Sequence, residues 1–385
     1  PSRADLIASK AMGNWKEETF AKHTAYIEGL TGQMYWLMAS RDHWRWNGFI
    51  NYGDVRTNWT RGGWVKDGVN ILYPMYWGMH GRYGWRNGSG EPYAGFLNFG
   101  LWTQDREVIL FAYDYATHVA DVDIMHGRFN QPLQKLQGGM HRRNKNHWSG
   151  AVQTQYTPSR GLYLMKWLSG NERLDDALAE VREFSRKNVQ GSVYCASAWQ
   201  NRYAETNDPQ DLKIADELLQ ACIKAWEESN SRKDEELKSL RGLPALYARN
   251  FRQSLDWWPI QIEFHRITDD PRYLQDLAER VSSDPLKNLK PHDLTIYYAV
   301  SYLLDQGYTP EQLGAEKITR MQEVLLKYSQ RFLPMLPREK WNLSALTAKR
   351  AFSESLEFSK QVGCAPFVLG FFPTATAEPA AEPAK

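Results

Sequence analysis

A short turn that recurs along the sequence constrains the fold more than any other feature. Each copy carries Asn, Asp or Gln, continues into a charged first helical turn, and leads to apolar residues at helical spacing. Asn and Asp oxygens accept hydrogen bonds from the unpaired amides of a helix start, and acidic side chains favour the positive end of the helix dipole. The four clear copies begin at Thr103, Ser169, Thr206 and Thr268, and a weaker fifth begins at Thr309.

Each turn separates two predicted helices. The helices expected after the turns cover 108–119, 174–184, 212–226 and 273–281, with a fifth through Met321 and Leu326; those expected before the turns cover 158–168, 193–205, 246–267 and 294–304. Repeated helical hairpins are typical of solenoids and closed toroids. The sequence therefore predicts an all-α fold, an α/α toroid forming an incomplete or closed barrel of hairpins, with long aromatic-rich loops.

We expect residues 1–372 to form this domain and residues 373–385, rich in Ala, Pro and Glu, to form a low-complexity tail. With 385 residues, of which 42% are hydrophobic, the chain can bury a large core. It has no run of about 18 apolar residues, the length that a membrane-spanning helix needs. The net charge is only +2, from 47 Lys and Arg against 45 Asp and Glu. We therefore expect neither a membrane nor a nucleic acid as partner.

Aromatic residues make up 13% of the chain and are dense within residues 41–100, where Trp and Tyr are interspersed with Arg, Asn and Gly. Aromatic faces pack on the C–H faces of sugar rings, and Arg and Asn bind carboxylates and hydroxyls. Basic residues outnumber acidic ones in the ring-rich part of this stretch, which indicates an anionic sugar. The alternative is that the rings fill the centre of the toroid. The candidate substrate-binding residues here are Trp46, Tyr52, Asp54, Trp59, Trp77, His80, Arg82 and Trp85.

A second stretch, residues 113–150, contains four histidines, and histidine transfers protons near neutral pH. On a continuous helix, Asp114, His118 and Asp121 would share one face. The catalytic candidates are His118, His141, Asn146 and His147, and the substrate-binding candidates are Arg142 and Trp148. The alternative use is a divalent cation held by His118, Asp121, His141 and His147. Further along, Arg249 is a candidate carboxylate clamp, with a solvated surface arginine as the equal alternative.

Several of these runs together resemble a known family. Tyr52-Gly53-Asp54, the run from Ala116 to His126 and Gly138-Gly139-Met140-His141 occur in an order similar to that of bacterial exo-rhamnogalacturonan-lyase-like proteins, which are polysaccharide lyases with a helical toroid catalytic domain. The resemblance covers roughly residues 50 to 180. It implies cleavage of a polysaccharide that contains uronic acid. It also implies a β-rich domain, absent from this sequence, as a further domain or second chain.

The residue types agree with that implication. β-Elimination needs a base for the C5 proton, an acid for the leaving oxygen, and cationic or amide groups that neutralise the carboxylate. A glycoside hydrolase that inverts configuration would instead need two carboxylates about 6.5 to 9.5 Å apart. The predicted base is His141 or His147, the acid is Tyr93 or Tyr156, and the neutralising groups are Arg82, Arg142 and Asn146.

We therefore expect a polysaccharide lyase that acts on an acidic polysaccharide or oligosaccharide. It would need no cofactor and would work in the extracellular space or periplasm, because polymers are not imported intact. The two alternatives are a glycoside hydrolase on the same scaffold, with a carboxylate pair from Asp54, Asp121 or Asp123, and a non-catalytic glycan-binding protein.

Overall fold

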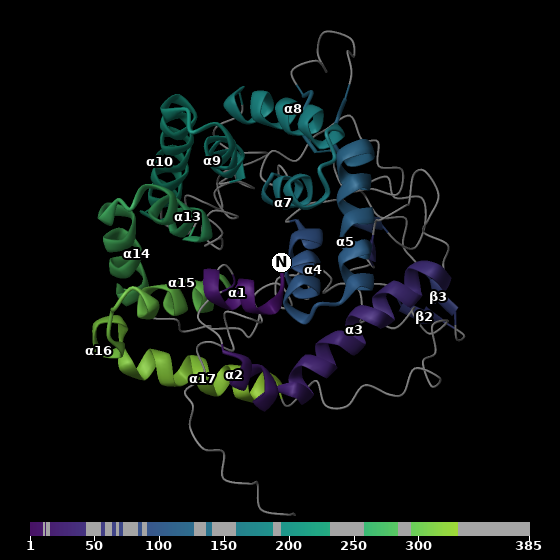
Figure 1. The fold of residues 1–385 in the computed structure, drawn as a ribbon, viewed down its shortest axis with the longest axis horizontal. Helices are drawn as coiled ribbons and strands as arrows, with labels where there is room; N and C mark the ends of the chain where they lie inside the picture. The colour runs from purple at the N-terminus through teal and green to yellow at the C-terminus, as the bar shows by residue number, and fades with distance from the viewer. Residues whose placement is uncertain are drawn as a thin grey trace, which may run out of the picture.

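The computed structural model describes residues 1–10, 12, 16–43, 55–57, 64–66, 69–71, 84–86, 91–126, 136–140, 159–187, 194–231, 258–283 and 294–329. Most of these residues are helical, as the sequence predicted (Figure 1). The helices are α1 (Arg3–Ser9), α2 (Glu17–Lys22), α3 (Thr24–His43), α4 (Pro92–Thr103), α5 (Arg106–His118), α7 (Arg160–Ser169), α8 (Arg173–Lys187), α9 (Tyr194–Thr206), α10 (Pro209–Ser231), α13 (Trp258–Thr268), α14 (Pro271–Ser283), α15 (Leu294–Asp305), α16 (Pro310–Leu313) and α17 (Ala315–Ser329), with a π-helix, η1 (Val119–Asp123), directly after α5.

The strands of the described residues are short and form two antiparallel pairs. β1 (Val55–Thr57) pairs with β4 (Gly84–Arg86), and β2 (Trp64–Lys66) pairs with β3 (Val69–Ile71). Three-residue strands of this kind do not change the fold class. None of the helices in the described part of the chain is both long and apolar enough to span a membrane.

The four recurring turns connect helices where the sequence placed them: α4 to α5, α7 to α8, α9 to α10, and α13 to α14. Each first helix ends at the Ser or Thr that opens its turn. The next residue adopts a left-handed conformation, with φ of 61° at Gln104, 65° at Gly170, 53° at Asn207 and 55° at Asp269. This reversal redirects the chain for the second helix.

An Asp or Asn then starts the second helix. Asp105 Oδ1 accepts from the amides of Glu107 and Val108, and Asp208 Oδ1 accepts from Gln210 at 2.9 Å. Asn171 and Asp270 do the same two residues ahead. These bonds satisfy amides that have no partner inside the helix. In each of these turns, the helix cap is therefore supplied by a neighbouring residue of the sequence.

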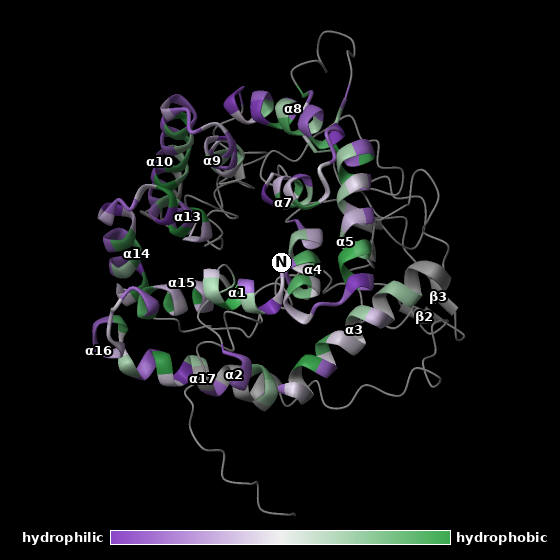
Figure 2. Cartoon of the chain, in the orientation of Figure 1, coloured by the Kyte–Doolittle hydropathy of each residue, from purple (hydrophilic) through white to green (hydrophobic). Residues whose placement is uncertain are grey.

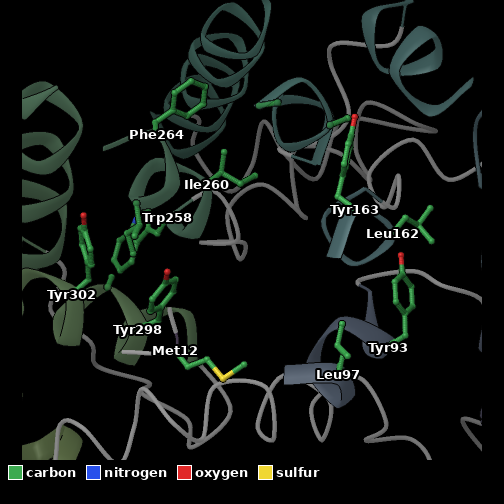
Figure 3. Packing of buried hydrophobic residues seen from close by; sticks show 14 of the residues in the cluster. Met12, Tyr93, Leu97, Leu162, Tyr163, Trp258, Ile260, Phe264, Tyr298 and Tyr302 are labelled. Atoms are coloured by element: carbon green, nitrogen blue, oxygen red, sulfur yellow. The ribbon is translucent and has the colours of Figure 1, made fainter. Parts of the chain in front are cut away.

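The two helices of a hairpin differ in character. α4 is mainly hydrophobic, whereas its partner α5 mixes hydrophilic with hydrophobic residues (Figure 2). An amphipathic second helix covers its hairpin and turns its polar face to water. The buried side chains of α4, α7, α13 and α15 belong to one continuous core, some of which Figure 3 shows.

The first helices contact one another in chain order. α4 packs on α7, α7 on α9, α9 on α13, and α13 on α15. α1 packs on α4, and Lys10 at its end binds Asp305 at the end of α15 at 2.9 Å. These contacts form a circuit that the helices follow around the middle of the view in Figure 1.

The two ends of the first helices have different connections in the sequence. The short turns follow their last residues. Longer segments, including residues 127–158 before α7 and 232–257 before α13, precede their first residues. Most candidate functional residues belong to these longer segments of the sequence.

Candidate functional site

Most of the predicted site residues lie outside the described residues. These are Trp46, Tyr52, Asp54, Trp59, Trp77, His80, Arg82, His141, Arg142, Asn146, His147, Trp148, Tyr156 and Arg249. Trp85 lies in β4, where it pairs with Arg56 of β1. Tyr93 and His118 lie in the described helices α4 and α5, so the geometry of the site is built from them and their surroundings.

Glu91, at the start of α4, links that helix to the start of α7. It lies in the aromatic-rich stretch, residues 41–100, and its Oε1 accepts from the backbone amides of Ser159 at 2.6 Å and Gly161 at 3.1 Å. Those amides lie at the start of α7, the first described helix after the imidazole-rich stretch, residues 113–150. The carboxylate is buried, with 7% of the residue exposed. One buried oxygen therefore holds the starts of α4 and α7 together.

Burial and the neighbouring groups shift the pKa of Glu91 in opposite directions. Burial raises the pKa of its carboxyl above the ordinary value, while the two amides and the guanidinium of Arg160 oppose the rise. Residue 91 also has a left-handed backbone, with φ of 52°. A left-handed backbone conformation at a non-glycine residue costs free energy, so it persists only where the surrounding structure holds the residue in place.

Tyr93 supports this junction. Its side chain is fully buried, and its hydroxyl donates to Glu91 Oε1 at 3.3 Å. Burial and the neighbouring Glu91 raise the pKa of Tyr93 well above its ordinary value. The ring also packs against Tyr115 of α5, with centroids 5.8 Å apart. Tyr93 thus adds a third donor to the same carboxylate.

Asp114 and His118 lie four residues apart in α5, as the sequence predicted, but Asp121 does not continue the same α-helical face. The α-helix ends at His118 and continues as the π-helix η1, whose wider turns change the direction of the side chains that follow. His118 is buried and its Nε2 lies 3.9 Å from Asp123 Oδ1. Asp121 binds Arg173 of α8 at 2.6 Å. The predicted alignment of Asp121 with the other two residues assumed an unbroken α-helix, which ends at His118.

The base of the imidazole-rich stretch is fixed on α8. His126 Nδ1 lies 2.6 Å from Glu180 Oε2, and Gln137 donates to the other oxygen of Glu180 at 2.8 Å. The backbone pairs across this base, with Met125 and Gly139 bonded at 2.8 Å. The described residues 136–140 of this stretch are therefore anchored on α8, and His141 lies outside the described residues.

A second group of polar side chains lies among the first helices. Arg160 at the start of α7 reaches Glu263 of α13, with Nη2 3.6 Å from Oε1. Arg266 and Tyr298 donate to the same oxygen, each at 3.2 Å. α7 and α13 are separated in the circuit by α9, so the Arg160–Glu263 contact joins two helices that are not neighbours in the circuit. We call Arg160, Glu263, Arg266 and Tyr298 the central cluster.

His265 and Tyr302 extend the central cluster along α13 and α15. His265 Nδ1 lies 2.7 Å from the Tyr302 hydroxyl, and both residues are buried. The Arg266 guanidinium lies over the ring of Tyr302, 5.1 Å from its centroid. Burial raises the pKa of Tyr302, and Arg266 opposes that rise. Tyr302 is therefore a hydrogen-bonded phenol at neutral pH.

Sequence reasoning missed Glu91, Arg160, Glu263 and Arg266. A weak signal existed for Glu91, because an acid directly before Pro92 occupies a helix start. Arg160 stands just inside the next first helix in a comparable place. For Glu263 and Arg266 the sequence shows only an i, i+3 pair on a helix, which is usually a surface feature.

Within the described residues, no group of three or more His, Cys, Asp or Glu side chains is placed to hold a metal ion. Of the residues considered for a divalent cation, His118 lies beside Asp123, Asp121 binds Arg173, and His141 and His147 lie outside the described ranges. Comparison with family models, with curated proteins and with solved structures finds no match to this chain.

Proposed function

We propose that this chain is the α/α-toroid catalytic domain of a polysaccharide lyase, one that cleaves a uronic-acid-containing polysaccharide by β-elimination. The circuit of first helices, with α1 linked to α15 through Lys10 and Asp305, supports the toroid. The resemblance of the sequence runs to exo-rhamnogalacturonan-lyase-like proteins supports the reaction. The substrate would be polymeric and acidic, which favours an extracellular or periplasmic location.

A single observation supports the function most directly: Glu91, in the aromatic-rich stretch, binds the amides of Ser159 and Gly161 at the start of α7, the helix that follows the imidazole-rich stretch in the sequence. A sugar-binding surface of rings and a proton-transferring set of histidines act together only if both reach one ligand. This contact supports the proposal that the two stretches lie near each other. The proposal extends this proximity to the side chains within them.

The reaction needs no co-reactant. The base, His141 or His147, removes the proton from C5 of the uronate, and the electron pair forms a C4–C5 double bond. The C4–O bond breaks, and the departing oxygen takes a proton from the acid. Arg82, Arg142 and Asn146 would neutralise the carboxylate next to C5 and so stabilise the negative charge that develops there.

The described geometry divides the candidate acids and bases. The Tyr93 hydroxyl is fully buried and donates to Glu91, so we assign Tyr93 the role of holding that carboxylate and keep Tyr156 as the proposed acid. His118 is buried beside Asp123, so we assign it to the support of η1 and keep His141 and His147 as the proposed bases. The proposal includes no cofactor.

The test is to incubate the chain with a panel of acidic polysaccharides and to follow ultraviolet absorbance and product mass. Unsaturated products are expected from the unaltered chain. Removing the true base should lower the rate at least on the order of 100-fold, so either His141→Ala or His147→Ala is expected to do so. His23→Ala, between α2 and α3, is the matched control and should retain the rate.

One result would contradict the assigned base, and two would contradict the lyase. Full release of unsaturated product by both histidine variants would remove the assigned base. New reducing ends without ultraviolet absorbance would indicate a glycoside hydrolase, and glycan-dependent quenching of Trp fluorescence without any product would indicate a binding protein.

A further inference from the structure

We infer that Arg160 and Arg266 form a binding site for one carboxylate of an acidic sugar, in the central cluster among the first helices. The identity of the ligand rests on the proposed function. The site itself rests on the geometry of residues that the sequence did not single out.

The two guanidinium groups have more donors than the cluster has acceptors. In the described part of the chain, Arg160 and Arg266 both contact Glu263 Oε1, which Tyr298 also contacts, and Arg266 also bonds to Tyr302. A guanidinium carries five N–H donors. Glu91 lies near Arg160, but its Oε1 already accepts from two backbone amides and the Tyr93 hydroxyl. The acceptors in the described part of the cluster are therefore fewer than the donors of the two guanidiniums, which leaves donors for a further carboxylate.

The cluster is oriented and reachable. The Arg266 guanidinium lies over the rings of Tyr302 and Tyr298, 5.1 and 6.0 Å from their centroids. Cation–π contacts of this kind hold the planar guanidinium group in place. The side chains of Arg160 and Arg266 retain 35% and 27% of their exposure, so a ligand can contact them. A planar carboxylate can accept two parallel hydrogen bonds from a guanidinium group.

The site also lies beside the proposed active segments. Arg160 is the first residue of α7, directly after Ser159, whose amide binds Glu91. A sugar chain that contacts both segments at this junction would have a neighbouring carboxylate within reach of Arg160. The central cluster would then select an acidic residue next to the cleaved bond.

The experiment measures binding separately from cleavage. A trimer of galacturonic acid and its neutral methyl ester are titrated into the unaltered chain by calorimetry. The acid should bind at least about tenfold more tightly than the ester. Added salt should weaken the binding of the acid and leave the binding of the ester unchanged. Arg160→Gln and Arg266→Gln should each weaken acid binding about tenfold and leave ester binding unchanged. Arg272→Gln, on the exposed start of α14, is the control.

Glu263→Gln separates a binding site from a structural ion pair. If the ligand competes with Glu263 for the guanidiniums, this variant should bind the acid several-fold more tightly. A purely structural network predicts a lower melting temperature and unchanged affinity, which would overturn the inference. Arg266→Lys, which keeps the charge but loses the fork, replaces Arg266→Gln if that variant does not fold.

Three other results would also overturn the site: equal binding of acid and ester, no binding of either, or full acid binding by both glutamine variants. Acid binding that depends on both arginines but yields no unsaturated product would keep the site and contradict the lyase. The two proposals therefore fail in different ways.

Discussion

The two ends of the first helices are built on different principles. At their last residues, the short turns are completed by hydrogen bonds between neighbours in sequence, such as Asp208 to Gln210. At the first residues of α4 and α7, Glu91 bonds to amides 68 and 70 positions away. The last residues of the first helices are therefore held by neighbours in sequence, and this pattern repeats. The first residues of α4 and α7 depend instead on contacts across the assembled fold.

This difference predicts that single changes at the junction cost more than single changes at a turn. Glu91→Ala should have the largest effect, a loss of about 3 kcal/mol in the free energy of unfolding, because it leaves buried amides without their acceptor. Urea unfolding measures it. Glu279→Ala on the exposed face of α14 is the control and should change stability by at most about 0.5 kcal/mol. Equal effects of the two changes would remove the distinction between the two sides.

Two glycines sharpen the comparison, because both have positive φ but only one packs against a neighbour. A Cβ on Gly138, at the base of the imidazole-rich stretch, would lie 2.0 Å from the carbonyl oxygen of Glu180, whereas Gly170, in a turn, has no described atom within 4 Å of that position. Gly170→Ala should cost about 1 kcal/mol, and Gly138→Ala at least about 2 kcal/mol. Thermal unfolding of both variants measures the two losses in stability. A larger loss for Gly170→Ala than for Gly138→Ala would contradict this prediction.

At the turns, losses should be small and independent. Asp208→Ala and Asp105→Ala should each cost about 1 kcal/mol, since each removes one helix cap. Because the two turns share no contacts, the double variant should lose the sum within about 0.5 kcal/mol. Asp208→Asn, which keeps an acceptor, should be close to neutral. Strong non-additivity in urea unfolding would show that the turns are not self-contained.

The smallest effect concerns pH. Burial raises the pKa of Glu91 in the folded chain, so folding favours its protonated form. The stabilisation from this protonation is fully present below its ordinary pKa of 4.5 and is lost as pH rises through the raised value. Glu91→Gln stays neutral and lacks this dependence. The stability gap between the unaltered chain and this variant should therefore be widest in acid and narrow toward neutral pH; a gap that widens would contradict the pKa direction.

The helices and turns were predictable because their signals are local. Thr206-Asn207-Asp208-Pro209 contains the hydroxyl, the left-handed residue, the cap and the first helical proline within four positions, and α10 begins at that proline. For the helix predicted over 246–267, the described part is α13, which covers Trp258–Thr268, and residues 246–257 lie outside the described ranges.

The candidate site was less predictable because its contacts are not local. Tyr93 was chosen as an acid from its residue type, yet its burial against Glu91 depends on α4, α5 and α7 packing together. The change from the α-helix α5 to the π-helix η1 has no signature in the spacing of the hydrophobic residues. Arg160 and Glu263 are separated by more than one hairpin, so nothing in the sequence pairs them.

The Glu91 contact has a thermodynamic consequence for ligands. Since one carboxylate links the starts of α4 and α7, displacement at one of these points changes the free energy of the arrangement at the other. A molecule that engages only the aromatic-rich segment would alter the affinity of the histidine-bearing one for a second molecule, and linkage requires the reverse effect to be equal. Sugar units bound along one chain would then associate cooperatively, and Glu91→Ala would uncouple them.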